Sequence, residues 1–184
     1  MGSSASGGFR SPAGVQMFRS PRGRRAIEAP RPDTLRMSHF YANLYVHLVW
    51  GTAGRAPLIS ERHAPRLHRR LAALVATARC EALAVGGVAD HVHLLVALHP
   101  AVAVSALVRA VKASTSQWVR HELGTPDFAW QEGYGVFSLR DDDATVVRSY
   151  VIRQPEHHAV GTTVASWERT SSDAATPRNP PQGG

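Results

Sequence analysis

The sequence predicts an α+β domain with a ferredoxin-like split βαβ core. In such a core, helices cover one face of an antiparallel sheet, and here one more helix follows at the C-terminal side. Apolar stretches of strand and helix periodicity alternate in the order β-α-β-β-α-β-α. Only Ala89 and Asp90 separate the second and third strands, which indicates an antiparallel hairpin. Together these observations predict the split βαβ arrangement.

Four segments have the composition of strands, because they are rich in apolar and β-branched residues and lie between turn signals. The second of them contains Gly86 and Gly87, where we expect the strand to be broken, since glycine weakens a strand interior. The predicted strands are residues 42–50, 82–89, 91–98 and 134–139.

Three segments have the spacing of helices. Residues 63–80 and 103–121 each place apolar side chains on one face. The third helix is expected to begin at the aspartates of residues 141–143, because carboxylates cap free N–H groups and favour the helix dipole there. We expect it to end at Gln154, because Pro155 follows. This third helix is the additional one.

The length of 184 residues suits one domain with tails. Residues 1–36 are rich in Gly, Ser, Pro and Arg and are predicted to be a disordered basic tail. The domain is predicted to span 37–158, and Met37 is a candidate natural start. Residues 159–184 are again rich in small and polar residues, and we predict a disordered C-terminal tail.

The net charge of +7 is concentrated outside the predicted domain. Residues 1–36 hold seven Arg against Glu28 and Asp33, a net charge of +5, which leaves +2 for the remainder. Charge alone therefore does not establish a nucleic-acid partner. Cys80 is the only cysteine, so the chain forms no internal disulfide, which fits a reducing cytoplasm. No apolar run approaches the roughly 20 residues of a membrane span, and the N-terminus lacks a secretory signal.

Two pairs of polar residues predict a reactive site. His91 and His93 lie two apart in a predicted strand and therefore share a face. Tyr150 and Gln154 lie four apart in a predicted helix and therefore project together. If the two faces meet, two imidazoles and an amide oxygen can hold a divalent cation loosely beside a phenol. Such a cation would polarise a phosphodiester, and the phenol could attack it.

Each of these residues also has a structural interpretation. His91 and His93 could be ordinary buried histidines, and Tyr150 lies at core spacing with its valine neighbours. His47 is expected to be structural or to support a metal ligand, and His157 and His158 to be solvated. Arg109, Lys112 and Arg120 belong to a polar helix stripe that would by default face solvent.

The pairs recur within a wider pattern. Its segments are YANLYVHLVWGTAGRAPLI (41–59), DHVHLLVAL (90–98), VSALVRAVKASTSQWV (104–119) and FAWQEGYGVFSLRDDDATVVRSYVIRQPEHH (128–158). In this order they resemble the single-tyrosine HUH transposases of insertion sequences and their domesticated relatives, the REP-associated tyrosine transposases. HUH denotes two histidines flanking a bulky hydrophobic residue. The resemblance spans roughly residues 38–158.

The resemblance implies a function for each matched residue. His91, His93 and Gln154 would bind Mg²⁺ or Mn²⁺, and Tyr150 would be the nucleophile that becomes joined to the 5′ phosphate of single-stranded DNA. The partners would be DNA with hairpin ends and a second copy of the chain, with no membrane involved. The protein would be cytoplasmic and associated with the nucleoid. Arg109, Lys112 and Arg120 would then be candidates for contacts with the DNA backbone.

The sequence departs from the family pattern near its end. Arg153 stands where Asn is frequent, Pro155 follows the predicted ligand, and residues 160–184 do not continue as a helix. A domesticated or degenerate binder of nucleic-acid hairpins, without transposition activity, is therefore the alternative. A small zinc hydrolase is a third hypothesis, although Asp90 is its only close carboxylate at a recognisable spacing.

Overall fold

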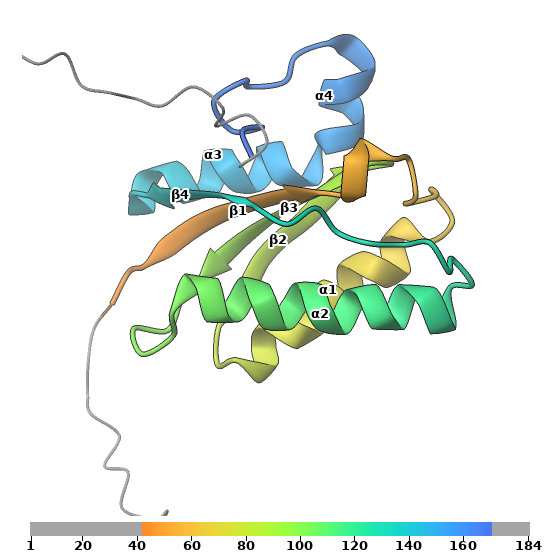
Figure 1. The fold of residues 1–184 in the computed structure, drawn as a ribbon. Helices are drawn as coiled ribbons and strands as arrows, with labels where there is room; N and C mark the ends of the chain where they lie inside the picture. The colour runs from red at the N-terminus through yellow and green to blue at the C-terminus, as the bar shows by residue number, and fades with distance from the viewer. Residues whose placement is uncertain (1–41, 171–184) are drawn as a thin grey trace, which may run out of the picture. The chain divides into compact units, whose positions relative to one another are not determined.

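The computed structural model describes residues 42–170 (Figure 1). Predictions for residues 1–41 and 171–184 lie outside the described residues. Within that part of the chain, the elements follow the predicted order, with two short helices added. They are β1 (Tyr45–Gly51), η2 (Ala53–Arg55, a 3-10 helix), α1 (Ala64–Thr77), β2 (Glu81–Val88), β3 (His91–Ala97), α2 (Val104–Glu122), β4 (Gly135–Leu139), α3 (Asp141–Ile152) and α4 (Gln154–Val160).

The four described strands form one antiparallel sheet in the order β2-β3-β1-β4. β2 and β3 form the predicted hairpin through Ala89 and Asp90. In the central pair of strands, Val49 lies opposite His93 and Gly51 lies opposite His91. β1 thus supports the histidine strand along its whole length.

Helices cover both faces of the sheet but not in the same way (Figure 1). α1 and α2 lie against one face, as in a ferredoxin-like fold, and α3 crosses the other, with α4 next to it. This confirms the predicted α+β class with an extra helix that carries Tyr150. The face covered by α3 is the face that His91 and His93 share.

The predicted break in β2 at Gly86 and Gly87 is wrong. The strand continues through both glycines, and its irregular register lies between Ala82 and Ala84. Gly86 serves a different purpose, because a Cβ atom there would lie 1.8 Å from the carbonyl oxygen of Val151 in α3. The missing side chain therefore allows α3 to pack directly on the sheet.

The predicted end of the last long helix is also wrong. α3 ends at Ile152, Arg153 adopts a non-helical conformation, and Gln154 begins α4. Pro155 lies in the first turn of α4, where its missing N–H costs no hydrogen bond. Proline here starts a helix instead of stopping one, so Tyr150 and Gln154 belong to different helices.

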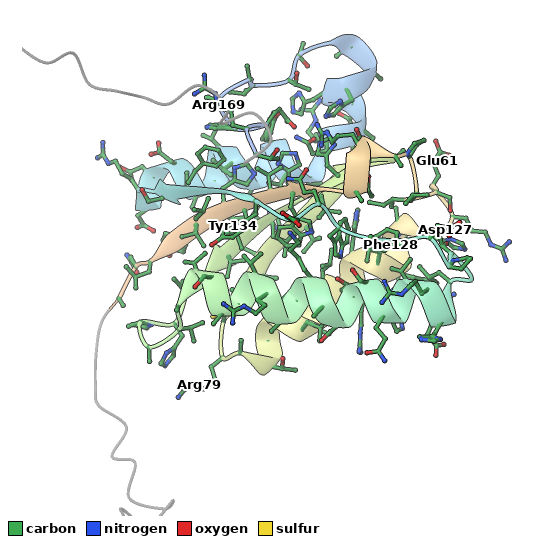
Figure 2. All side chains as sticks on the ribbon, in the orientation of Figure 1. Glu61, Arg79, Asp127, Phe128, Tyr134 and Arg169 are labelled. Carbon is green, nitrogen blue, oxygen red and sulfur yellow. The ribbon has the colours of Figure 1, made fainter. Side chains whose placement is uncertain are left out.

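The predicted start of a disordered tail at residue 159 is wrong for residues 159–170. α4 continues to Val160 and ends at Gly161, whose positive φ of 69° reverses the chain. Residues 161–170, here called the C-terminal segment, then return over α3, and Figure 2 shows Arg169 on that side of the sheet. Trp167 packs beside the small apolar cluster between α3 and the sheet, which explains why this polar stretch is ordered. No helix among residues 42–170 is long and apolar enough to cross a bilayer.

Candidate active site

Two imidazoles are held in fixed orientations on the α3 face of β3. His91 and His93 are fully buried. The Nδ1 atom of His91 lies 2.6 Å from the Oδ1 atom of Asp90, and Nδ1 of His93 lies 2.8 Å from Nε2 of His47. With both Nδ1 atoms engaged, both Nε2 atoms are directed at one space. Partners of this kind orient the histidine ligands of metal sites.

Tyr150 and Gln154 reach the same space from α3 and from the start of α4. The rings of Tyr150 and His93 meet edge to face, with centroids 6.0 Å apart. Tyr150 is 4% exposed and Gln154 is fully buried. The structure therefore brings together the four residues predicted to be ligands and nucleophile, and all four belong to one chain.

Glu168 of the C-terminal segment occupies the centre of this arrangement, and its role was not predicted. Its Oε2 atom lies 3.2 Å from Nε2 of His91 and 3.2 Å from Nε2 of His93. Its Oε1 atom accepts a hydrogen bond from the Tyr150 hydroxyl and one from the Gln154 amide at 3.4 Å. Nε2 of His158 lies 3.9 Å from Oε2.

Tyr150 is also held from the other side of its hydroxyl. The backbone N–H of Val164 donates to the Tyr150 oxygen at 3.1 Å, and the indole of Trp167 contacts the ring edge to face at 4.9 Å between centroids. The C-terminal segment therefore contacts Tyr150 as hydrogen-bond donor, as acceptor and by packing.

Burial and charge set the protonation of the site. Burial, and after it the hydrogen bond to Glu168, raises the pKa of Tyr150 above its ordinary value, so the residue is a phenol near neutral pH. Burial would raise the pKa of Glu168, but the close contacts of its carboxylate with the imidazoles of His91 and His93 hold it well below the usual range. Burial lowers the pKa of His93, and that of His47 to about 3. The site thus combines a carboxylate with neutral His93 and His47.

Three buried atoms of the site have no hydrogen-bond partner among the described residues. They are Nε2 of His91, Oε1 of Gln154 and Nδ1 of His47. Burying an unpaired polar atom is costly, and an imidazole nitrogen and an amide oxygen are both atoms that can bind a divalent cation. His91, His158 and Glu168 also offer ligand atoms that all lie within 4.8 Å of one another. The donor set therefore fits a metal ion.

The three predicted DNA-contacting residues lie elsewhere. They belong to α2, on the opposite face of the sheet (Figure 1). The ammonium of Lys112 donates to the carbonyls of residues 131–133 at 2.6, 3.1 and 2.9 Å, which engages its three donors. This argues against a phosphate contact by Lys112. Arg120 donates to the Phe128 carbonyl at 3.0 Å, and Arg109 is exposed.

Sequence reasoning missed three contributors to the site. Asp90 was noted only as a nearby carboxylate. His158 was interpreted as solvated, and it is exposed, but its Nε2 also lies 3.9 Å from Glu168. Glu168 was assigned to the tail, although its neighbour Trp167 is the one large aromatic residue after Tyr150. An aromatic beside a carboxylate in an otherwise small and polar stretch was the available signal.

Comparison with protein families identifies the class of protein that this fold and site define. The model of the IS200-like transposases matches residues 40–154, and the chain belongs to this family. The predicted family is thereby confirmed. No protein of curated function matches the sequence.

Two solved structures have the same fold. One is a candidate transposase from Deinococcus radiodurans, with 20% identity, a TM-score of 0.50, and coverage of 61% of this chain and 91% of that one. The other is a REP-associated tyrosine transposase bound to a REP hairpin, with 17% identity, a TM-score of 0.51, and coverage of 76% and 86%.

Proposed function

We propose that this transposase cleaves and rejoins single-stranded DNA through a covalent link to Tyr150, with Mg²⁺ or Mn²⁺ held by His91, His93 and Gln154. One observation carries the proposal: the Tyr150 hydroxyl and the Nε2 atoms of both histidines all contact the single carboxylate of Glu168. A phosphate group placed there would touch nucleophile and metal ligands at once.

The chemistry conserves the energy of the phosphodiester. The Tyr150 oxygen forms a bond to phosphorus, the bond from phosphorus to the 3′ oxygen breaks, and that oxygen gains the proton that Tyr150 loses. A 3′ hydroxyl can then attack the phosphotyrosine and reverse these changes. A bound divalent cation would act as a Lewis acid on the phosphodiester.

The chain's own residues prepare this reaction. Asp90 and His47 fix the two imidazoles, and α3 places the phenol beside them. Because the Tyr150 hydroxyl is bonded to Val164 and Glu168, a substrate phosphate must replace at least the contact with Glu168. Release of the C-terminal segment from Tyr150 therefore precedes attack.

The proposed substrate is single-stranded DNA flanked by a hairpin. The related structure bound to a REP hairpin supports a partner of this class. Unpaired nucleotides can be drawn into a recessed site, whereas a duplex holds its phosphates apart from it. Arg109 and Arg120, on the far face, are proposed to contact the backbone of the hairpin, which extends beyond the site.

We also propose a homodimer. In the described part of the sheet, β2 and β4 are the edge strands, and an edge strand can pair with a second chain. Light scattering after size exclusion should give a mass of about twice 19.9 kDa.

The test is a covalent adduct assay. The protein is incubated with Mn²⁺ and a hairpin DNA from the flanks of its own gene, labelled at either end, and analysed on a denaturing protein gel. Wild type should give a band that retains only the label 3′ of the cut, and Tyr150→Phe should give none while binding the hairpin normally. An adduct in Tyr150→Phe would contradict the proposal.

A second candidate is a hairpin-binding protein that no longer transposes. It is favoured by the engagement of the Tyr150 hydroxyl on both sides by the C-terminal segment. Hairpin binding with no adduct under any divalent cation, in wild type and in a variant ending at Gly161, would support this candidate over the enzyme. Cleavage with no protein-linked product would instead support a hydrolase.

A further inference from the structure

Glu168 is positioned as a ligand would be. Its carboxylate is 16% exposed and lies against the Nε2 atoms of both histidines, at 3.2 Å in each case. Two atoms that bind one cation at about 2.1 Å are about 3.0 Å apart at a right angle and about 3.4 Å apart at the tetrahedral angle. The observed separations fall between these values.

A single N–H on His91 does not satisfy both of its carboxylate contacts. A neutral imidazole has one N–H, and in His91 the close contact with Asp90 requires it at Nδ1. The lone pair of Nε2 then faces the carboxylate of Glu168, an arrangement that needs either a second proton or a cation between them.

The charge of the predicted ligand set leads to the same conclusion. Two imidazoles and an amide are neutral, so they leave both charges of a divalent cation uncompensated in a buried place. A carboxylate supplies one negative charge and the hard oxygen that Mg²⁺ and Mn²⁺ prefer. Glu168 is the carboxylate that contacts both histidines.

We propose that Glu168 is an additional ligand of the metal ion, binding with His91 and His93 in the form of the protein that is free of DNA. This inference rests on the proposed function for the metal site itself. Glu168 comes from the C-terminal segment, outside residues 40–154 that match the family. Because its other oxygen accepts from Tyr150, metal binding and the position of the nucleophile are coupled through one side chain.

The experiment measures Mn²⁺ affinity without DNA, from the electron paramagnetic resonance signal of free Mn²⁺, in full-length protein. Glu168→Gln should raise the dissociation constant at least tenfold. Glu156→Gln is the matched control, because Glu156 is an exposed glutamate of α4 paired only with Arg153 in the described structure, and it should bind as wild type does. Glu168→Asp should recover part of the affinity.

The outcomes separate this inference from the proposed function. If wild type binds Mn²⁺, His91→Ala does not, and Glu168→Gln binds as tightly as wild type or more tightly, the metal site stands and Glu168 is no ligand. Tighter binding would mean that the carboxylate competes with the cation. If wild type does not bind Mn²⁺, or binds it independently of His91, both proposals fail. The visible spectrum of bound Co²⁺ gives a second measurement, and it should change in Glu168→Gln.

Discussion

The two faces of the sheet use neighbouring residues of the same strand for opposite purposes. In β3, Val92, Leu94 and Val96 point toward α1 and α2 and join a large apolar core. The residues between them point toward α3, where His91 and His93 lie beside Leu95. One strand therefore contributes both to the main core and to the candidate site.

The face under α3 has little apolar packing of its own. Its small apolar cluster consists of Ala84, Leu95, Val147 and Val151, and Val49 is buried beside His93. Next to them lie buried polar groups, whose removal from water opposes folding. This difference indicates that apolar packing on the α1 and α2 face supplies most of the stability of the fold. That stability offsets the cost of burying imidazoles and an amide on the α3 face.

The largest expected effect comes from truncating the apolar face. Leu94→Ala removes a fully buried side chain and should lower the free energy of unfolding by roughly 2–5 kcal/mol. Urea denaturation measures it. Leu44→Ala is the control, because Leu44 is 44% exposed and should change stability by less than about 0.5 kcal/mol. Comparable losses in both variants would contradict the assignment of the core to this face.

On the opposite face, substitution should affect binding more than stability. Asp90→Asn weakens the hydrogen bond that orients His91 and should reduce Mn²⁺ affinity about 10–100-fold. Asp142→Asn, at an exposed aspartate, is the control and should leave affinity unchanged. If Asp90→Asn instead lowers the free energy of unfolding as far as Leu94→Ala does and leaves metal binding unaltered, the proposed difference between the two faces is wrong.

The smallest effect is expected on α2. Lys112→Met removes three hydrogen bonds to the loop at residues 131–133 and should cost about 1–2 kcal/mol, partly offset by relief of a half-buried charge. Arg109→Met should not change stability. The dependence of hairpin affinity on salt should be unchanged in Lys112→Met, and its slope should fall by about 1 in Arg109→Met if Arg109 contacts a phosphate. A reduced slope in Lys112→Met would restore that residue as a DNA contact.

The features of this structure that depend on neighbouring residues could be predicted from the sequence. Alternation in β3 predicts both faces of the strand, and the two-residue link at Ala89 and Asp90 predicts the hairpin. The four-residue spacing of Tyr150 and Gln154 predicted that their side chains project together, and the structure places both beside the histidines. Its explanation was wrong, because Gln154 follows a break at Arg153 and Pro155 begins a helix.

The non-local part could not be derived from patterns. Glu168 contacts His93 across 75 positions of the chain, and no periodicity connects the two. Gly86 was interpreted as a strand breaker. A glycine is needed there because the backbone of Val151, in α3, leaves no room for a side chain. Both errors concern contacts between segments that become neighbours only after α3 has packed on the sheet.

The hydrogen bond between His47 and His93 links the tautomer of the His47 ring to the state of His93. A neutral imidazole exists in one of two tautomers. When Nε2 of His93 binds a cation, the hydrogen of His93 resides on Nδ1 and is donated to Nε2 of His47, which must then be protonated at Nδ1. When Nε2 of His93 instead donates to Glu168, the hydrogen of His47 resides on Nε2.

Cation binding should therefore exchange the tautomers of both rings together. Because burial lowers the pKa of His47 to about 3, this ring remains neutral over the physiological range, and acid does not obscure the exchange. The ¹⁵N chemical shifts of His47 would then report the arrival of a metal ion one ring away.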